Sequence, residues 1–585
     1  MSESPRKEPV DKARRVTRRR SERRATSLLS HGEPMVWLTG GALAIASLMI
    51  LGLLALVLWH GLPTFWPGPL VQVQTHAGRT LAGEVSVTER FAPEPSVVEA
   101  LPEGVRAAAR SELERGEGRT RRRMLRTGNY ELSGSHFNWV SDLEIASESE
   151  PEWLVLVERL SWGRFYGTPR AITIDGARTE GEPGVLWARF EEHHDEVRAR
   201  WERRRELEVV EIGEVNHRME AARLRVRAAE LASGVDSDEA RAARGESQRV
   251  ATAAEEDFRS LQAQIATLRE QNARYTLELE TADGARATLA LEEVVRAFAP
   301  NRLGTAARLG VYVDRTLEFL VDEPREANSE GGVFPAIFGT VLMTLIMAVL
   351  VVPFGVLAAL YLREYARPGP IVSAVRIAIN NLAGVPSIVF GVFGLGFFCY
   401  IVGVQVDELL FAAKLPTPTY GKGGLVWASL TLALLTLPVV IVPTEEALSS
   451  VPSSMREGSY ACGATKWQTI WRIVLPRAMP GIMTGMILAL ARGAGEVAPL
   501  MLVGAVKLAP ELPLDATAPF LHAERSFMHL GFHIYDLGFQ SQNSEAAKPM
   551  VYTTTLLLIA LVVTLNLLAI WIRARLRRRF QGNQL

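Results

Sequence analysis

The sequence alternates between long apolar stretches and long polar ones. Residues 35–59 contain no charged side chain, and a helix of this length crosses a hydrocarbon core of about 30 Å. Five further apolar stretches follow residue 330. We therefore expect a mainly α-helical, polytopic membrane protein with six transmembrane helices: residues 35–59, 333–362, 374–402, 424–442, 478–506 and 550–572.

Basic residues lie at both ends of the chain. Ten Lys and Arg precede Ala25 in the tail formed by residues 1–34, and five Arg lie within the tail 573–585. Such runs can bind nucleic acid, but beside membrane segments they act more simply as cytoplasmic retention signals. A cleaved signal peptide is excluded for residues 35–59, which exceed an h-region of roughly 7–15 residues. We expect both termini in the cytoplasm and residues 60–330 outside it, in the periplasm.

Residues 60–330 form a large polar insert that begins with short alternating runs. Alternation of apolar and polar side chains predicts half-buried strands. The runs at 275–280 and 286–291 flank Asp283-Gly284, a β-hairpin signal. The insert therefore contains a predicted β domain. Its other predicted strands are residues 70–74, 81–87, 153–157 and 171–174.

Between these strands, residues 186–273 are typical of a coiled-coil hairpin. A polar break at 233–238 separates two seams of apolar positions spaced alternately three and four residues apart. We expect two antiparallel arms that bury their seams only against each other, and hence an independent module. The predicted seams are Ile212, Val215, Met219, Ala222, Val226 and Ala229 in the first arm, and Ala254, Phe258, Leu261, Ile265 and Leu268 in the second.

Composition excludes several classes of function. The chain of 585 residues carries 64 Lys and Arg against 65 Asp and Glu, so its net charge of about zero argues neither for nor against a nucleic-acid partner, because the charges are strongly segregated along the chain; we expect no such partner. Its two cysteines, Cys399 and Cys462, have no metal-ligand spacing, and we expect no disulfide. The sequence contains no G-x-x-x-x-G-K-[ST] phosphate loop. We predict a chain that is not an enzyme and holds no metal or cofactor.

A polar segment at 444–477 precedes the fifth apolar stretch. Pro452 suits a first helical turn, and Gly463 can adopt the left-handed conformation that ends a helix. Thr465 and Gln468 have capping-box spacing for a second short helix, which we expect Pro476 to close. An ordinary cytoplasmic loop would account for this composition.

The order of residues in this segment indicates more. Glu457, five residues, Gly463, nine residues and then Ile-Val-Leu-Pro resembles the coupling loop of binding-protein-dependent ABC importer permeases. The family pattern is Glu-Ala-Ala, three residues, Gly, nine residues, Ile-x-Leu-Pro. Here Gly458 and Ser459 replace the two alanines. The resemblance implies an ATPase-docking loop carried by Glu457, Gly463, Ala464, Leu475 and Pro476.

Two further motifs resemble the A-type permease subunits of phosphate (Pst) importers: RGAGEVAPL at 492–500 and NNLAGVPSIVFGVFGLGF at 380–397. The resemblance covers roughly residues 331–573 and implies a type I ABC importer fold with a five-helix core at 331–572. It also implies a second permease subunit, an ATPase dimer that binds ATP, and a periplasmic phosphate-binding protein as partners. The family carries no counterpart of the insert at 60–330.

Arg492 and Glu496 are the candidate substrate-pathway residues. They are spaced i,i+4 on one face of a predicted helix inside the apolar stretch 478–506. Burying charges in a membrane costs free energy, and such charges usually face a transport pathway or the interior of the helix bundle. A purely structural ion pair is the alternative. Resemblance implies a role in transport, although Val497 stands where a threonine is common in the family.

The function expected from these features is phosphate import by alternating access across the inner membrane. Import of another oxyanion is a rival within the same class. A rival from another class is a membrane-anchored scaffold or force-transmitting protein whose working part is the external coiled coil. A coupling loop with intact spacing argues against an anchor that has no ATPase to contact.

Overall fold

The computed structural model describes residues 34–515, 518–541 and 544–581. It divides into two compact units, residues 1–59 and 60–585. The first unit consists of most of helix α1 (Pro34–Gly61), which is apolar throughout. The predicted basic tail at 1–34 lies outside the described residues except for its last position, as do the last four residues of the tail 573–585.

Six helical segments of the described chain are long and apolar enough to cross a membrane. This count agrees with the sequence prediction, and the chain is a multi-pass membrane protein. The candidate spans are Trp37–Phe65, Phe334–Tyr365, Ser387–Leu410, Leu425–Ser449, Lys466–Gly495 and Ala547–Arg575.

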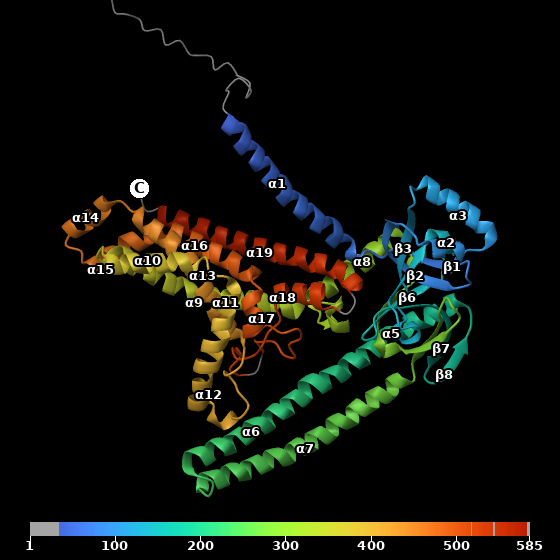
Figure 1. The fold of residues 1–585 in the computed structure, drawn as a ribbon. Helices are drawn as coiled ribbons and strands as arrows, with labels where there is room; N and C mark the ends of the chain where they lie inside the picture. Colours follow the sequence, from blue (N-terminus) through green and yellow to red (C-terminus); the bar gives the residue numbers. More distant parts are fainter. Residues whose placement is uncertain (1–33, 516–517, 542–543, 582–585) are drawn as a thin grey trace, which may run out of the picture. The chain divides into compact units, whose positions relative to one another are not determined.

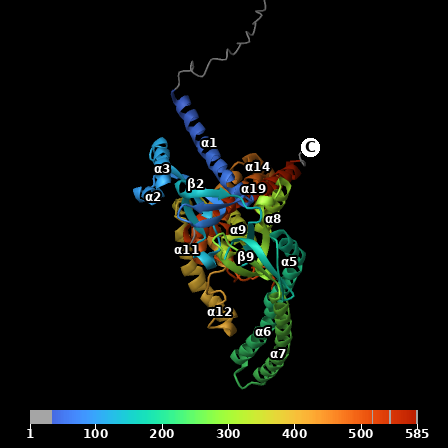
Figure 2. The ribbon, with the colours of Figure 1, turned by 90° about the vertical axis from the view of Figure 1, so that its right-hand side faces the viewer.

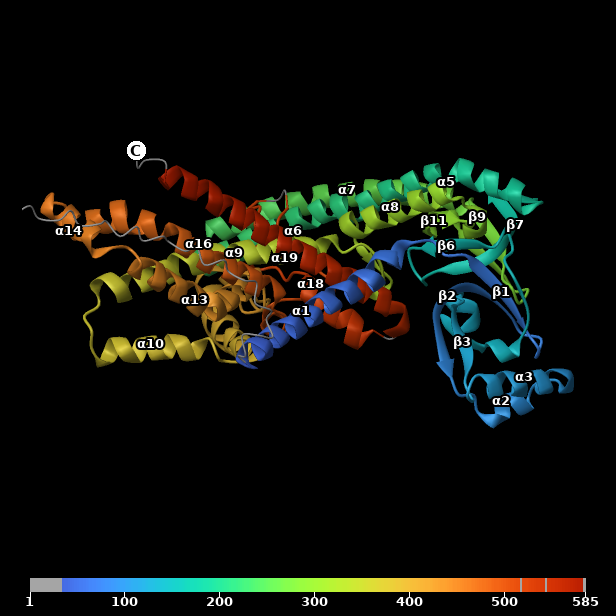
Figure 3. The same cartoon turned by 90° about the horizontal axis from the view of Figure 1, so that it is seen from above.

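Helix α13 (Leu425–Ser449) is the most buried of these spans and packs against both α9 (Phe334–Leu360) and α16 (Leu475–Gly495) (Figures 1 and 3). Its approach to α9 is close because Gly355 has no side chain: a Cβ there would lie 2.6 Å from Cγ1 of Val440. Small residues permit such close helix packing in membranes, where water drives little association. The outer helix α19 (Ser544–Gln581) packs against α16.

The predicted span at 374–402 is wrong at its N-terminal end. Helix α10 (Pro370–Leu382) ends before Pro386, and a separate helix starts with α11 (Ser387–Phe393). The residue before a proline is disfavoured in the helical conformation, so the chain breaks here although its hydropathy continues. The new helix runs on through a π-helical segment, Gly394–Gly403, into α12 (Val404–Leu410).

Arg376, Asn380 and Asn381 consequently lie on α10 and outside the span. No residue of α10 is buried. Arg376 forms an ion pair with Glu445 of α13. The arginine therefore joins two elements of the core next to the segment 444–477.

The insert contains two large antiparallel sheets, and six of their strands lie at the predicted alternating runs, whereas β3, β4, β5, β8 and β11 were not predicted. One has the strand order β4-β3-β2-β1-β5, and the other β10-β9-β7-β6-β11 with β8 added beside β7. The strands are β1 (Leu70–Thr75), β2 (Thr80–Phe91), β3 (Thr120–Arg126), β4 (Phe137–Ser141), β5 (Ile145–Ser149), β6 (Val155–Arg159), β7 (Phe165–Ile174), β8 (Ala177–Glu180), β9 (Thr276–Glu280), β10 (Arg286–Ala290) and β11 (Val294–Phe298).

A buried ion-pair network joins the sheets to α8 (Thr305–Val321), the helix that precedes α9. Glu158 of β6 lies 2.6 Å from Arg315 of α8 and 2.7 Å from Arg296 of β11. Burial alone would raise the pKa of Glu158, but these arginines and Arg164 hold it well below its usual value. Breaking one member would leave buried charge unpaired, which typically costs about 3–5 kcal/mol.

The predicted antiparallel hairpin is present in the insert. Its first arm is α5 (Pro183–Glu206), a π-helical turn at Leu207–Glu211 and α6 (Ile212–Ser233). The second arm, α7 (Asp238–Ala273), lies beside α6 (Figures 1 and 2). Gly234, with φ +93°, makes the turn, and the Ser237 hydroxyl caps α7 by accepting from the Ala240 N–H at 3.1 Å.

Two expectations about the hairpin are wrong. Met219, predicted in the seam, is 38% exposed, whereas Val215 and Ala222 are buried. The hairpin is also not independent over its whole length. Leu186 and Val197 of α5 are fully buried in one cluster with Leu277 of the sheet, because the base of the arm completes the core of the β domain. The separable part lies beyond Leu207, where the arms contact each other.

We expect deletion of residues 214–260, with Gly213 joined to Leu261 by a short glycine-rich linker, to leave the β domain folded. The removed residues pair across the hairpin, as the Arg218–Asp257 ion pair at 2.5 Å shows. Limited proteolysis of the purified full-length chain should give a stable fragment that contains both sheets. As a control, deletion of residues 197–268 removes Val197 and should make the sheets protease-sensitive. Equal sensitivity of both variants would contradict the assigned boundary.

Candidate functional site

The segment at 444–477 forms the two predicted short helices, α14 (Ser453–Ala461) and α15 (Lys466–Thr469). Gly463 has φ +81°, the left-handed conformation expected between them. The capping box is present in full: Thr465 Oγ1 accepts from the Gln468 N–H at 3.3 Å, and Gln468 Oε1 accepts from the Thr465 N–H at 2.9 Å. We call residues 444–477 the coupling segment.

Pro476 does not close the second helix, contrary to the prediction. A π-helical turn at Ile470–Val474 leads directly into α16, and Pro476 lies in the first turn of α16. The wider turn accommodates a residue that has no N–H to donate and whose ring crowds the preceding turn. The coupling segment therefore continues into the membrane as one helical span, Lys466–Gly495.

Arg456 anchors the coupling segment to the core. Its guanidinium donates to the carbonyl oxygens of Val451 at 2.6 Å and Leu448 at 2.9 Å, and pairs with Glu364 at 2.8 Å. Beneath it, Ile470 and further apolar side chains are buried against the C-terminal parts of α9 and α13. These contacts fix the position of the loop relative to α9 and α13.

The coupling segment presents an accessible surface. Glu457 and Gly463 are exposed, Ala464 is half-buried, and Leu475 and Pro476 are half-buried at the start of α16. Sequence reasoning missed the aromatic part of this surface. Trp467 and Trp471 are 57% and 58% exposed and stack with ring centroids 5.7 Å apart. Their i,i+4 spacing in a polar helix was the signal that could have revealed them.

Arg492 and Glu496 are brought together, but not on one helical face as predicted. Helix α16 ends at Gly495, and Glu496 has extended backbone angles (φ −79°, ψ 135°). Nε of Arg492 lies 3.5 Å from Oε1 of Glu496. A second short helix, α17 (Ala498–Val503), starts after this break. The ion pair therefore connects the last turn of α16 to the extended residue between α16 and α17.

Helices α9 and α11 pack closely against the break between α16 and α17. Gly493 contacts α9, where a Cβ would lie 2.5 Å from Sδ of Met347. Pro499 packs against Gly391 of α11, where a Cβ would lie 2.7 Å from Cα of the proline. Nε of Arg492 has no hydrogen-bond partner among the described residues, while 35% of its side chain stays accessible. This Nε is itself buried beside Glu496, so the accessible part of the side chain is elsewhere on Arg492.

A polar cluster next to this break was also missed from the sequence. Asp536 is buried, with Nζ of Lys507 3.1 Å from its Oδ2, and the Asn328 amide donates to the Lys507 carbonyl oxygen at 3.1 Å. His529 and His533 are buried close by in sequence, and burial lowers the pKa of His533 to about 4. Lys507 and His529 lie in the loop between α17 and α18 (Leu530–Tyr535), His533 lies on α18, and Asp536 follows it in a π-helical turn. Asn328 comes from the distant 3₁₀ turn Glu326–Asn328, so no local pattern reveals the cluster.

Comparison with known proteins decides the family. Residues 351–582 match the sequence profile of the "binding-protein-dependent transport system inner membrane component" family. The chain is 36% identical over 250 residues to the phosphate transport system permease protein PstA 1 of Mycobacterium tuberculosis, covering 43% of this chain and 73% of the relative. The chain belongs to the Pst-type permease family.

Another similar protein is PstA of Mycobacterium leprae, 43% identical over 176 residues, which are 30% of this chain and 52% of the relative. Among solved structures, the inward-facing MetNI methionine ABC transporter matches with 23% identity and a TM-score of 0.30, over 41% of this chain and 94% of that one. Permeases of this family are non-catalytic components of ABC importers, and this Pst-type permease is such a subunit. The family match begins after the insert.

In this Pst-type permease, we expect Gly463→Asp to leave the chain folded but to uncouple uptake from ATP hydrolysis. A side chain at φ +81° costs of order 1 kcal/mol, and no atom lies within 4 Å of the added Cβ, so the added charge extends from the exposed surface. Uptake and ATPase activity of the reconstituted complex measure the effect. Gly458→Asp, in the same segment but inside α14, serves as the control. Normal uptake by Gly463→Asp would count against an ATPase-docking role.

Proposed function

We propose that this chain is a membrane-spanning subunit of an ATP-driven importer of inorganic phosphate that works by alternating access. The Arg492–Glu496 pair at the helix break carries the proposal, and the names of its relatives support phosphate as the substrate. Its partners would be a PstC-like permease, a PstB-like ATPase dimer that binds ATP, and a PstS-like periplasmic phosphate-binding protein. The termini would be cytoplasmic and the insert periplasmic.

The chemistry of the pair suits a transient anion site. A guanidinium offers several N–H donors in a planar fork that matches phosphate oxygens. Arg492 alone would hold an anion too strongly in a poorly hydrated passage. Glu496, 3.5 Å away, competes for the same donors and returns the arginine to an ion pair once the anion leaves. Binding is thereby kept strong enough for selection and weak enough for release.

The coupling segment and the anion site are parts of one helical span. Lys466–Gly495 contains 30 residues, so Trp471 and Arg492 are about 32 Å apart along the axis at 1.5 Å per residue. A displacement of the coupling segment by the ATPase would move the whole span. The break at Glu496 is then the place where this movement changes the surroundings of Arg492.

Arg492→Ala and Glu496→Gln should each abolish phosphate uptake while the complex assembles and retains basal ATPase activity. The two side chains are 35% and 20% accessible, so an unpaired partner costs less than the about 3–5 kcal/mol of a fully buried pair. Uptake of labelled phosphate into proteoliposomes, size-exclusion chromatography and ATPase assays give the three readouts. Leu488→Ala, one turn earlier on α16 and 49% exposed, is the control.

The double variant Arg492→Met with Glu496→Gln separates the two roles of the pair. It removes both charges and leaves neither unpaired, so a structural role predicts near-normal transport. The proposed pathway role predicts an assembled but inactive complex. If the wild-type complex instead transports sulfate and not phosphate, the importer class stands and the phosphate assignment is wrong.

A further inference from the structure

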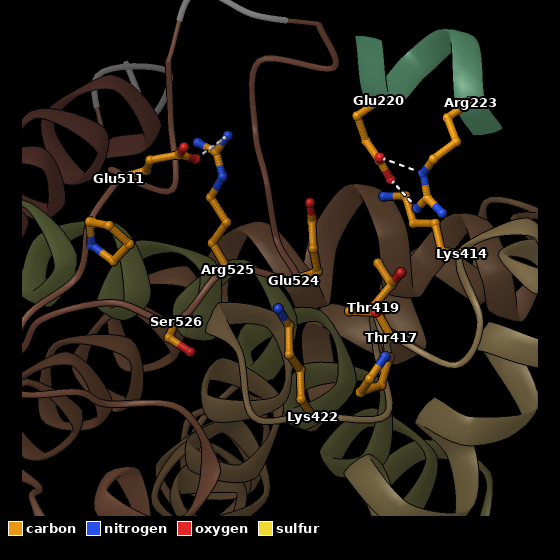
Figure 4. A pocket seen from close by; sticks show the side chains of 12 residues that line it. Glu220, Arg223, Lys414, Thr417, Thr419, Lys422, Glu511, Glu524, Arg525 and Ser526 are labelled. Atoms are coloured by element: carbon orange, nitrogen blue, oxygen red, sulfur yellow. Dashed lines mark hydrogen bonds and ion pairs between the residues drawn. The ribbon is translucent and has the colours of Figure 1, made fainter. Parts of the chain in front are cut away.

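The hairpin of the insert contacts a loop of the membrane core. Helix α6 contacts the short 3₁₀ turn Ala412–Lys414, which follows α12. On α6, the Glu220 carboxylate accepts two hydrogen bonds from Arg223, each at 2.7 Å. Lys414 reaches toward this pair from the core (Figure 4). The contact encloses one side of a pocket of ≈ 500 Å³ between insert and core.

The floor of the pocket is a rigid loop. Asp407 is 2% exposed, and its carboxylate accepts from the backbone N–H groups of Thr419, Tyr420 and Gly421 at 2.8–2.9 Å. Nε1 of Trp427 donates to the Tyr420 carbonyl oxygen at 2.7 Å. Four hydrogen bonds thus hold the loop that presents the lining residues, so the pocket needs little ordering when it binds a ligand.

The opposite wall is also fixed. Arg525 donates to the Leu512 carbonyl oxygen at 2.7 Å and pairs with Glu511 at 2.8 Å and Asp515 at 2.5 Å. Its charge is therefore neutralised within the wall. Arg223 is neutralised in the same way by Glu220 on the hairpin.

Two lysines line the pocket, and one of them acts on a carboxylate: the pKa of Glu220 is lowered by its hydrogen bonds from Arg223 and also by the charge of Lys414. Among the described residues, neither Lys414 nor Lys422 forms an ion pair, although Lys414 lies over the Phe411 ring at 5.5 Å. Thr417 and Thr419 line the space between them. Glu524 faces the same space (Figure 4), and Nδ1 of His522 lies 3.6 Å from its Oε1. The pocket therefore combines two ammonium groups, hydroxyl groups and one competing carboxylate.

We propose that this pocket is an external binding site for a small tetrahedral oxyanion, held by Lys414 and Lys422 and separate from the Arg492 site. The proposal rests on the proposed function for the identity of the anion. The ammonium groups supply the attraction, and the threonine hydroxyls donate hydrogen bonds to the remaining oxygens. Glu524 weakens the binding, since it repels the anion and attracts the same lysines. The insert thus supplies one wall of a site that the family core alone does not enclose.

The competing explanation is that these charged residues only hold the insert and the core together across a hydrated contact. The effect of removing the Glu524 carboxylate distinguishes the two explanations. If Lys414, Lys422 and Glu524 only hold insert and core together, removing any of them weakens the contact in the same direction. If they bind an anion, removing the lysines and removing the carboxylate change the affinity in opposite directions. The sign of the Glu524 effect is therefore informative where a loss of binding alone is not.

The test is ³¹P NMR line broadening of inorganic phosphate by the purified full-length chain in a maltoside detergent. Every protein carries Arg492→Ala, so that the pathway site contributes no binding. Lys414→Ala with Lys422→Ala should weaken phosphate binding roughly 3- to 10-fold, as expected for two accessible charges. Glu524→Gln should tighten it, and Arg225→Gln, whose partner Glu246 lies on α7 outside the pocket, should change nothing.

Phosphate binding that is unchanged by the double lysine variant, or weakened by Glu524→Gln, would overturn the proposal, as would an Arg492→Ala chain that binds no oxyanion. Sulfate is titrated in parallel to separate this inference from the proposed function. Sulfate binding with the same dependence on the lysines and on Glu524 would retain the pocket and reject phosphate. If the lysine and Glu524 variants leave phosphate binding unchanged while Arg492→Ala abolishes uptake as expected, the proposed function is retained and the pocket proposal is rejected.

Discussion

The structure depends on one helical span, Lys466–Gly495, that begins in the coupling segment and ends at the break beside Glu496. Pro476 does not interrupt it because a π-helical turn precedes the proline. The span is continuous even though Pro476 and Pro480 have no N–H to donate. In the proposed mechanism it links the accessible Trp467–Trp471 surface to the Arg492–Glu496 pair.

The insert contacts the rest of the chain in two places that differ in how buried their charges are. At its base, the buried network around Glu158 and Arg315 joins the sheets to α8. Near its middle, α6 contacts the turn Ala412–Lys414 after α12, and the exposed Glu220–Arg223 ion pair of α6 lies at this contact. Buried charges such as those of the first contact are costly to separate, whereas exposed charges such as those at the second are individually weak.

The parts of the fold that could be predicted are those that neighbouring residues determine. Gly463 and the Thr465–Gln468 capping box are local, so their spacing was sufficient. Both helix breaks were missed, since hydropathy continues through Pro386 and through Val497; Pro386 was the one local signal, and backbone geometry alone marks the break at Val497. The Glu158–Arg315 pair was beyond prediction, because its partners are 157 residues apart and only the sheet brings them together.

The central claim is that the coupling segment and Arg492 move as one body, and a distance within the span tests it most directly. Spin labels at Arg472 and Leu488, in a chain whose Cys399 and Cys462 are replaced, lie 16 residues apart, or about 24 Å along the axis. Their separation is measured by pulsed electron paramagnetic resonance in the assembled complex, with and without trapped ATP. The account predicts the same distance in both states while uptake remains coupled to hydrolysis. A change of several ångströms on ATP binding would contradict it.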